Sequence, residues 1–260
     1  MIFTSKKSLL ADQRVAADIV TEVLLELQRL TKPDVSLDML DEMAERMIRE
    51  RDGTPYNKGY KPEWAAEPFP ATVCMSVDYE ICHAPPGGRF LKEGSIINYD
   101  LGVKYKSGCG DAALTLAVGK IDNRKERAIY YALQTLYEGI KVIRAGIPIS
   151  DIGFAIQRFA NTRGYKVIKE FGGHHIGREM HEKPFIRHIF DSEYSNIFLE
   201  EGAVICLEPL ITPGKGNVAI DPRNKWTAYV TDGQPVAMFE HQILVLKDGY
   251  EILTKHLTPP

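Results

Sequence analysis

The chain has 260 residues, and the 44% of them that are apolar are enough to bury a large core. The net charge of −3 and pI near 6.2 give no basic footprint for nucleic acid, and no apolar run approaches the ~18 residues of a membrane-spanning helix. The first ten residues, MIFTSKKSLL, lack the features of a secretory signal, and the four cysteines show no CxxC spacing, so we expect a cytoplasmic protein with reduced thiols.

Two amphipathic helices are predicted at the start of the chain. Residues 8–31 carry apolar side chains at steps of three and four, and Pro33 ends this pattern. Ser36 offers an N-cap oxygen to a second helix, which Gly53 ends. Residues 54–70 are rich in proline, glycine and aromatics, and therefore predict a long irregular loop of the kind that often has a function.

Strand signals follow the loop. Residues 72–77, 95–105 and 113–120 are rich in β-branched and apolar side chains, with turn residues between them. The sequence SGCGD at 107–111 separates the second and third of these segments. Glycine permits either a hairpin turn or a bulge there, and the sequence leaves both open.

The same order of elements then returns. Asp122 and Asn123 can cap a helix over about 124–144, and Ser150 can cap a fourth helix that Gly164 ends. Five strand-like segments follow, at 165–171, 203–211, 226–231, 235–246 and 250–254.

Two helices followed by strands thus occur twice, which indicates an internal structural duplication. We expect one α+β domain over 1–260, with similar halves at roughly 1–121 and 122–260. Helices would pack on the outside of a mostly antiparallel sheet.

A histidine-rich stretch, FGGHHIGREMHEKP at 171–184, contains His174, His175 and His181 among glycines. Glycine weakens helix and strand interiors, because it loses the most backbone freedom on ordering. The stretch therefore predicts a loop that holds imidazoles in place. Alone it is as typical of an ordinary glycine-rich loop as of a metal or catalytic site.

Four carboxylates favour the metal interpretation. Asp100 and Asp111 lie eleven residues apart on or beside predicted strands, so a hairpin can bring them together. Glu208 and Glu240 lie in apolar strand-like segments, where a carboxylate is costly unless it is paired or coordinated. Each acid alone is more often a surface or capping residue. Together with a histidine they form a mixed oxygen and nitrogen set, which suits Mn²⁺, Fe²⁺, Co²⁺ or Zn²⁺ better than Ca²⁺ and can bridge two ions.

These residues resemble the motifs of the type I methionine aminopeptidases, which have the pita-bread fold. The resemblance covers nearly the whole chain, and its motifs are Asp100 in IINYDLGV, Asp111 in GCGDA, His174 in GHHIG, Glu208 in Glu-Pro and Glu240 in Glu-His. It implies two divalent metal ions between the halves. Asp111 and Glu240 would bridge them, Asp100 would bind one ion, and His174 and Glu208 would bind the other.

Two further histidines match the same family. His83, in EICHAPP, corresponds to a histidine that contacts the scissile amide, and His181 to one that polarises the substrate carbonyl. The resemblance implies that a metal-bridging hydroxide attacks the first peptide bond, with Glu208 as general acid and base. The products would be free N-terminal methionine and a shortened polypeptide.

The resemblance also implies an apolar methionine pocket, formed by Phe69, Cys74, His83, Met180, His181 and Trp226. Some positions depart from the family pattern. Met180 replaces a phenylalanine, and Gly102 replaces a threonine. His175 replaces a common glycine, and Ala66 lies where a pocket tyrosine is expected. None of these changes removes a predicted metal ligand.

Glu240 follows Glu208 by 32 positions, which leaves no room for the helical insertion of type II enzymes. The chain is therefore similar to the short bacterial form, which implies a monomer that acts on nascent chains, with transient ribosome association. One alternative is an Xaa-Pro aminopeptidase or dipeptidase of the same fold, although these usually carry an additional N-terminal domain. Another is a non-catalytic binding homologue, in which metal ligands are expected to be lost. A third is an unrelated α+β domain whose acids are coincidental.

Overall fold

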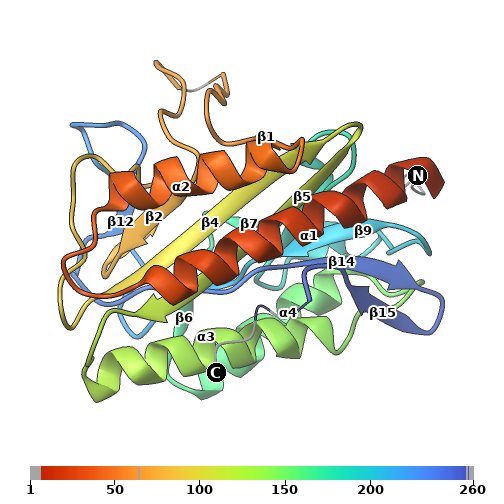
Figure 1. The fold of residues 1–260 in the computed structure, drawn as a ribbon. Helices are drawn as coiled ribbons and strands as arrows, with labels where there is room; N and C mark the ends of the chain where they lie inside the picture. Colours follow the sequence, from red (N-terminus) through yellow and green to blue (C-terminus); the bar gives the residue numbers. More distant parts are fainter. Residues whose placement is uncertain (1–6, 64, 256, 258–260) are drawn as a thin grey trace.

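The computed structural model describes residues 7–63, 65–255 and 257 (Figure 1). Residues 1–6, which begin the segment examined for a secretory signal, lie outside this range. The helices are α1 (Lys7–Leu30), α2 (Leu37–Glu50), α3 (Asn123–Ile140), α4 (Ile149–Thr162) and a short 3₁₀ helix, η1 (Ser192–Tyr194). None of the described helices has the length and apolar character needed to cross a membrane.

The helix predictions hold, with two corrections. The Ser36 hydroxyl accepts a hydrogen bond from the Met39 N–H at the start of α2, as an N-cap does. However, α3 ends at Ile140 rather than at residue 144. The N-cap predicted at Ser150 is wrong, because Pro148 occupies that position and Ser150 lies buried in the first turn. The Ile149 N–H is already paired with the Ile197 carbonyl, so a side-chain cap is not needed for it.

The strands of the described residues form four antiparallel groups. The first contains β4 (Ile96–Tyr105), which pairs with β1 (Thr54–Pro55), β2 (Cys74–Val77) and β5 (Gly108–Ala117). The largest has the order β15 (Gly249–Ile252), β14 (His241–Leu246), β9 (Val204–Leu207), β7 (Gly172–His175) and β8 (Glu182–Arg187). Two smaller groups are β13 (Ala237–Met238), β10 (Leu210–Thr212) and β6 (Lys166–Val167), and β11 (Val218–Ile220), β12 (Ala228–Val230) and β3 (Glu80–Cys82).

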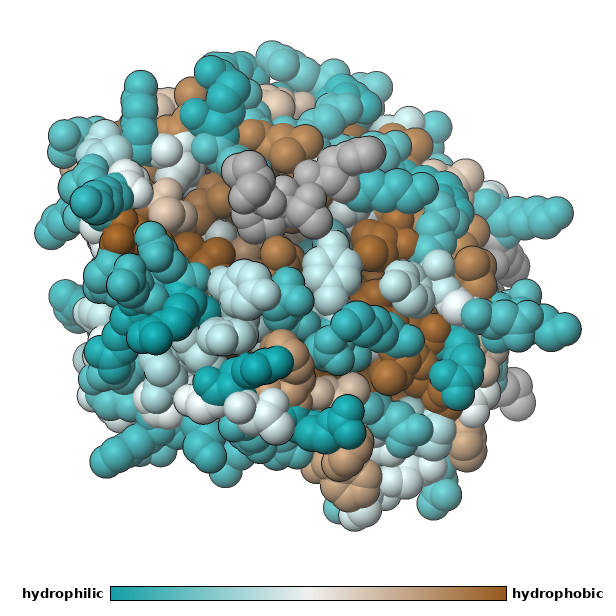
Figure 2. All heavy atoms as spheres, turned by 90° about the horizontal axis from the view of Figure 1, so that it is seen from below, coloured by the Kyte–Doolittle hydropathy of each residue, from teal (hydrophilic) through white to brown (hydrophobic). Residues whose placement is uncertain are grey.

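The four α-helices of the described residues pack against one apolar face of this β-structure. In Figure 1, α1 and α2 cross β4 and β5, and α3 and α4 lie below them. One continuous apolar core joins all of these elements, with Leu24 of α1, Leu101 of β4, Leu136 of α3, Ile152 of α4 and Ile243 of β14 all fully buried. The α3 and α4 side is seen in Figure 2, where small groups of apolar residues are separated by hydrophilic ones. This arrangement is the pita-bread fold that the sequence resemblance implies.

The sequence SGCGD proves to be part turn and part strand. The hairpin turn lies at Lys106, which has a positive φ of 48°, and at Ser107, so the turn interpretation is confirmed there. Gly108 and Gly110 already belong to β5 and face α1. A Cβ atom on Gly110 would lie 2.5 Å from the Ala16 carbonyl carbon, so these glycines allow the helix to contact the strand backbone directly.

Candidate active site

The hairpin of β4 and β5 brings two predicted ligands to one face. Asp100 pairs with Ala113, and Gly102 pairs with Asp111, so Asp111 lies two residues along β5 from the partner of Asp100. Because side chains alternate between faces of a strand, both carboxylates point to the same side. A regular antiparallel register therefore places together two acids that are eleven residues apart in the chain.

A third carboxylate joins them through a single β-bridge. The Glu240 N–H donates to the Ala113 carbonyl at 2.8 Å, just before β14 begins. Ala113 consequently has Asp100 on one side and Glu240 on the other. The small alanine side chain between them leaves space on the face that carries the acids.

The histidine stretch differs from its prediction as a loop. Gly172, Gly173, His174 and His175 form β7, which pairs with β8 on one side and β9 on the other. A Cβ atom on Gly173 would lie 2.1 Å from the Cys206 carbonyl oxygen of β9, so glycine is required here by close strand packing. His181 does lie outside a strand, immediately before β8.

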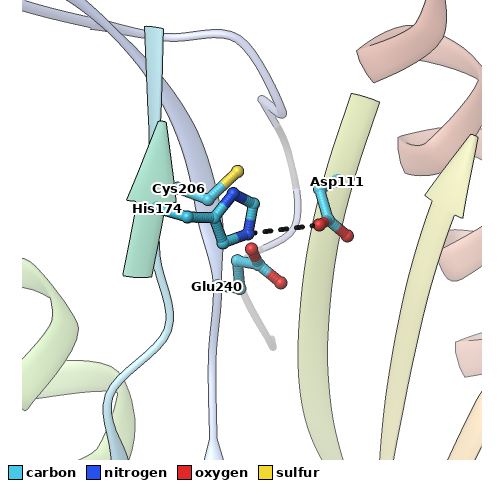
Figure 3. Close-up of side chains that lie close together, drawn as sticks. All are labelled: Asp111, His174, Cys206 and Glu240. Carbon is cyan, nitrogen blue, oxygen red and sulfur yellow. Dashed lines mark ion pairs between the residues drawn. The ribbon is translucent and has the colours of Figure 1, made fainter. Parts of the chain in front are cut away.

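His174 presents one ring nitrogen to the carboxylates. Its Nδ1 lies 3.1 Å from the His175 carbonyl oxygen, which can only accept, so Nδ1 carries the proton and Nε2 has a free lone pair. That Nε2 lies 3.6 Å from both Asp111 Oδ2 and Glu208 Oε1. Figure 3 shows His174 on β7 facing Asp111 on β5, with the Glu240 side chain between these two residues. An imidazole lone pair among carboxylate oxygens is a donor set typical of a site for a divalent metal ion.

The electrostatics of this cluster lead to the same conclusion. Burial, with a smaller contribution from Asp111, raises the pKa of Asp100 well above its usual range, and burial raises the pKa of Asp111 to about 8. Burial and the neighbouring acids likewise raise the pKa values of Glu208 and Glu240. The Glu240 Oε1 atom is buried and has no hydrogen-bond partner. Divalent cations would compensate the charge of these oxygens, so the donor set fits the metal that the sequence predicts.

Cys206, which stands two residues before Glu208 in the chain, lies beside this cluster. Ligand atoms of Asp111, His174, Cys206 and Glu240 all lie within 4.8 Å of one another (Figure 3). The thiol forms a hydrogen bond with Glu240, and burial raises the pKa of Cys206 well above its usual value. The thiol also packs in an apolar cluster behind the site that includes Met180. The neutral thiol of Cys206 therefore helps to position the Glu240 carboxylate through this hydrogen bond.

The two other predicted histidines border the same space. The His181 ring centroid lies 4.6 Å from that of His174. His83 has a positive φ of 57°, an uncommon conformation for a residue with a Cβ and one that clusters at functional sites. Burial, followed by the proximity of His181, lowers the pKa of His83 to about 4, so the ring is neutral near pH 7.

One cavity of about 460 Å³ unites the predicted site residues. Its lining includes all of them: Phe69, Cys74, His83, Asp100, Asp111, His174, Met180, His181, Glu208, Trp226 and Glu240. Phe69, Cys74 and Trp226 form a buried apolar cluster, with the Phe69 and Trp226 rings edge to face at 5.2 Å. The cavity thus has a charged inner end and an apolar, aromatic pocket.

Two positions that depart from the family pattern touch each other. A Cβ atom on Gly102 would lie 2.4 Å from the Met180 Cε atom, so the glycine provides the space that this methionine occupies. Ala66 is not among the described residues that line the cavity. Tyr60 does line it, with its ring centroid 5.8 Å from that of His181 and the two rings tilted by 50°. His175 is buried in β7 and is not among the residues that line the cavity.

Sequence reasoning missed several residues of this site. Tyr60 could have been found from the aromatic content of the loop at 54–70. His188, by contrast, carries no local signal. Its Nε2 accepts hydrogen bonds from the Gly173 N–H at 3.0 Å and the Glu208 N–H at 3.4 Å, and so ties together the backbones that carry His174 and Glu208. Burial, then His174, lowers the pKa of His188 to about 3, which keeps this acceptor neutral.

The chain is similar to known proteins over nearly its full length. The sequence model of metallopeptidase family M24 matches residues 11–247. Methionine aminopeptidase 1 of Bacillus subtilis is 34% identical over 98% of this chain and 100% of its own. The crystal structure of methionine aminopeptidase from Rickettsia prowazekii superimposes with a TM-score of 0.92 at 31% identity, covering 98% of this chain and 100% of that one.

A more distant likeness concerns the fold alone. The Xaa-Pro dipeptidase from Bacillus anthracis has a TM-score of 0.74 at 21% identity, with 98% of this chain covered but only 62% of that one. The family match and the close full-length relatives show that the chain belongs to metallopeptidase family M24, among its methionine aminopeptidases.

Proposed function

We propose that this protein is a metal-dependent aminopeptidase that removes the N-terminal methionine from polypeptides. One observation carries the proposal: four carboxylates, two buried and two half-buried, and the His174 lone pair face one cavity, which also contains an apolar pocket. The four carboxylates would be stabilised by divalent cations, and the pocket of Phe69, Cys74 and Trp226 suits an unbranched apolar side chain. The matched relatives named methionine aminopeptidases support the same reading.

We assign the metal ligands as Asp100, Asp111, His174, Glu208 and Glu240, holding two divalent ions of the Mn²⁺, Fe²⁺, Co²⁺ or Zn²⁺ class. Bound there, such ions lower the pKa of water and polarise a carbonyl oxygen, which is the chemistry that peptide hydrolysis needs. The hydrogen bond from His174 Nδ1 to the His175 carbonyl fixes the ring with Nε2 directed at the carboxylates. The cluster therefore needs little rearrangement to bind a cation.

The remaining residues bind substrate and move protons. Phe69, Cys74 and Trp226 would enclose the methionine side chain, with Met180 at the same cavity wall. His181 would donate a hydrogen bond to the carbonyl of the scissile bond, and His83 would contact its amide. The Glu208 side chain, 18% exposed, opens toward the cavity and would carry a proton to the leaving amine.

We further propose the substrates, the cellular location and the oligomeric state of the protein. The substrates would be nascent chains in the cytoplasm, reached by transient association with ribosomes, and the protein would act as a monomer. The single domain would consist of two related halves that meet near residue 121. In the described cavity, no feature favours the Xaa-Pro alternative, and the full ligand set argues against a non-catalytic homologue.

The test is hydrolysis of Met-Ala-Ser by protein stripped with chelator and resupplied anaerobically with Mn²⁺, Fe²⁺ or Co²⁺. We expect metal to restore release of methionine, with little cleavage of Leu-Ala-Ser or Ala-Pro-Ser. Metal-dependent cleavage of another peptide would retain the metal site and overturn the pocket assignment. Folded protein that is inactive with every metal would overturn the proposal.

A further inference from the structure

The cavity continues beyond the residues assigned to chemistry. Glu170, Phe171, Arg187 and Tyr194 also line it, and the proposed function gives them no role. His83 stands between the two parts of the cavity. Its ring makes edge-to-face contacts with Trp226, at 6.5 Å, and with Phe171, at 5.9 Å. The methionine pocket therefore lies on one side of His83, and this second region lies on the other.

The register of β7 and β8 sets the distance to this region. Gly172 pairs with Arg187, and His174 pairs with Phe185. A strand rises about 3.3 Å per residue, so Arg187 stands about 7 Å from the His174 level along β7. An extended substrate that runs beside β7 covers the same distance in about two residues. With the scissile bond near His174 and His83, the third residue of the substrate reaches Arg187.

Arg187 is held in place but keeps unused donors. Its Nη1 donates to the Lys169 carbonyl at 3.4 Å, and its Nε lies 3.5 Å from Asp191 Oδ2. Its Nη2 has no acceptor among the described residues, and the side chain is 45% exposed. Arg187 is the single cationic side chain among the described residues that line the cavity. Glu170 is the acid of the same outer region, since the other lining acids belong to the proposed metal cluster.

We propose that Arg187 and Glu170 form a subsite that reads the charge of the third residue of the substrate. Arg187 donates to an acidic side chain there, and Glu170 opposes the same side chain by like-charge repulsion. The inference rests on the proposed function, because it takes the direction of the substrate from the methionine pocket. It adds a preference among nascent chains that all begin with methionine.

The test compares Met-Ala-Asp-Ser with Met-Ala-Asn-Ser, which have nearly the same shape at the third residue. For the metal-loaded wild type we expect kcat/KM to be about threefold higher for the aspartate peptide, as a partly exposed ion pair allows. The ratio should fall toward one when the salt concentration rises from about 0.05 M to about 0.5 M.

Variants separate the two side chains. Arg187→Met should bring the ratio to about one. Arg187→Glu should invert the preference, and Glu170→Gln should raise the ratio above that of the wild type. Arg144→Met, at an exposed arginine outside the cavity lining, is the matched control and should leave the ratio unchanged.

The outcomes distinguish this inference from the proposed function. If the wild type releases methionine from both peptides with the same kcat/KM at low salt, the subsite is refuted and the aminopeptidase proposal stands. The same conclusion follows if a measured preference survives both Arg187 variants. If neither peptide is cleaved with any metal, the proposed function fails, and the subsite fails with it.

Discussion

The proposed metal site has two walls that are built differently. The β4–β5 wall presents Asp100 and Asp111 from inside long strands in unbroken register, backed by direct contact between β5 and α1. On the opposite wall His174 lies beside a register shift, while Glu208 and Glu240 lie just outside the ends of strands. The first wall is therefore fixed by regular local pairing. The second depends on contacts between segments distant in the sequence.

Because of this difference, we expect stability and activity to respond differently to changes in the two walls. The first wall contributes carboxylates, and burying them without a cation is unfavourable. The packing of β5 against α1 must therefore stabilise this wall. The second wall contributes the imidazole and is positioned by polar contacts such as those of His188. Substitutions in the two walls should consequently have distinct signatures in activity and in unfolding.

The largest effect on activity is expected from Asp111→Asn. The amide keeps the shape but loses a proposed metal ligand, so metal-restored methionine release should fall more than about 100-fold. Without metal, the variant should unfold at the same or a higher temperature than the wild type, because a buried carboxylate with a pKa near 8 is removed. Kinetics and calorimetry on chelated protein measure both. Asp248→Asn, in the exposed turn after β14, should change neither, and full activity of Asp111→Asn would refute the ligand assignment.

The largest effect on stability is expected where the first wall meets α1. In Gly110→Ala the new Cβ would lie 2.5 Å from the Ala16 backbone, which the helix can relieve only by moving away. We expect a loss of about 2–3 kcal/mol in the free energy of unfolding, measured with urea. Gly249→Ala, whose Cβ meets nothing within 4 Å, is the control. Equal stability of the two variants would show that α1 does not hold this wall closely.

His188→Phe tests the second wall. Two buried N–H groups lose their acceptor, so we expect stability to fall by about 1–3 kcal/mol and kcat/KM to fall about tenfold. His188→Gln keeps an acceptor oxygen and should recover part of both losses. If Phe and Gln variants are equally impaired, the ring acts through its volume rather than through its hydrogen bonds.

The smallest expected effect lies far from both walls and depends on pH. Arg14 of α1 donates two hydrogen bonds to Glu251 of β15, at 2.8 and 2.6 Å, and this pairing lowers the pKa of Glu251 from 4.5 to about 2. A lowered pKa in the folded state stabilises the protein above pH 4.5, and that contribution disappears as the pH falls toward 2. Because Arg14 is 41% exposed, we expect less than about 1 kcal/mol.

Urea unfolding of Glu251→Gln and wild type checks this. The two should differ at pH 7 and converge as the pH approaches 2. A difference that is constant over this range would mean that the ion pair contributes nothing to stability.

Local patterns predicted the helices well. The apolar spacing of α1 and α2 and the capping residues Ser36 and Asp122 needed only neighbouring residues, and each is confirmed. The prediction for Ser150 was wrong because the Ile149 N–H takes its partner from residue 197, outside the local window. The loop predicted at 171–184 was wrong in its first part for the same reason, since glycines that weaken an isolated strand are required where β7 packs against β9.

The sequence alone predicted the residues that are proposed to carry the chemistry, because carboxylates and histidines in apolar or glycine-rich segments are costly without a ligand and their motifs resemble one family. Only the tertiary structure decided how they meet. In the structure Ala113 lies between Asp100 and Glu240, and Tyr60 lines the cavity. Gly102 leaves the space that Met180 occupies, and Arg187 lies in the outer part of the cavity, beyond His83. Each of these relations joins segments that are far apart in the chain or on different strands, and therefore depends on strand register and packing that no local pattern encodes.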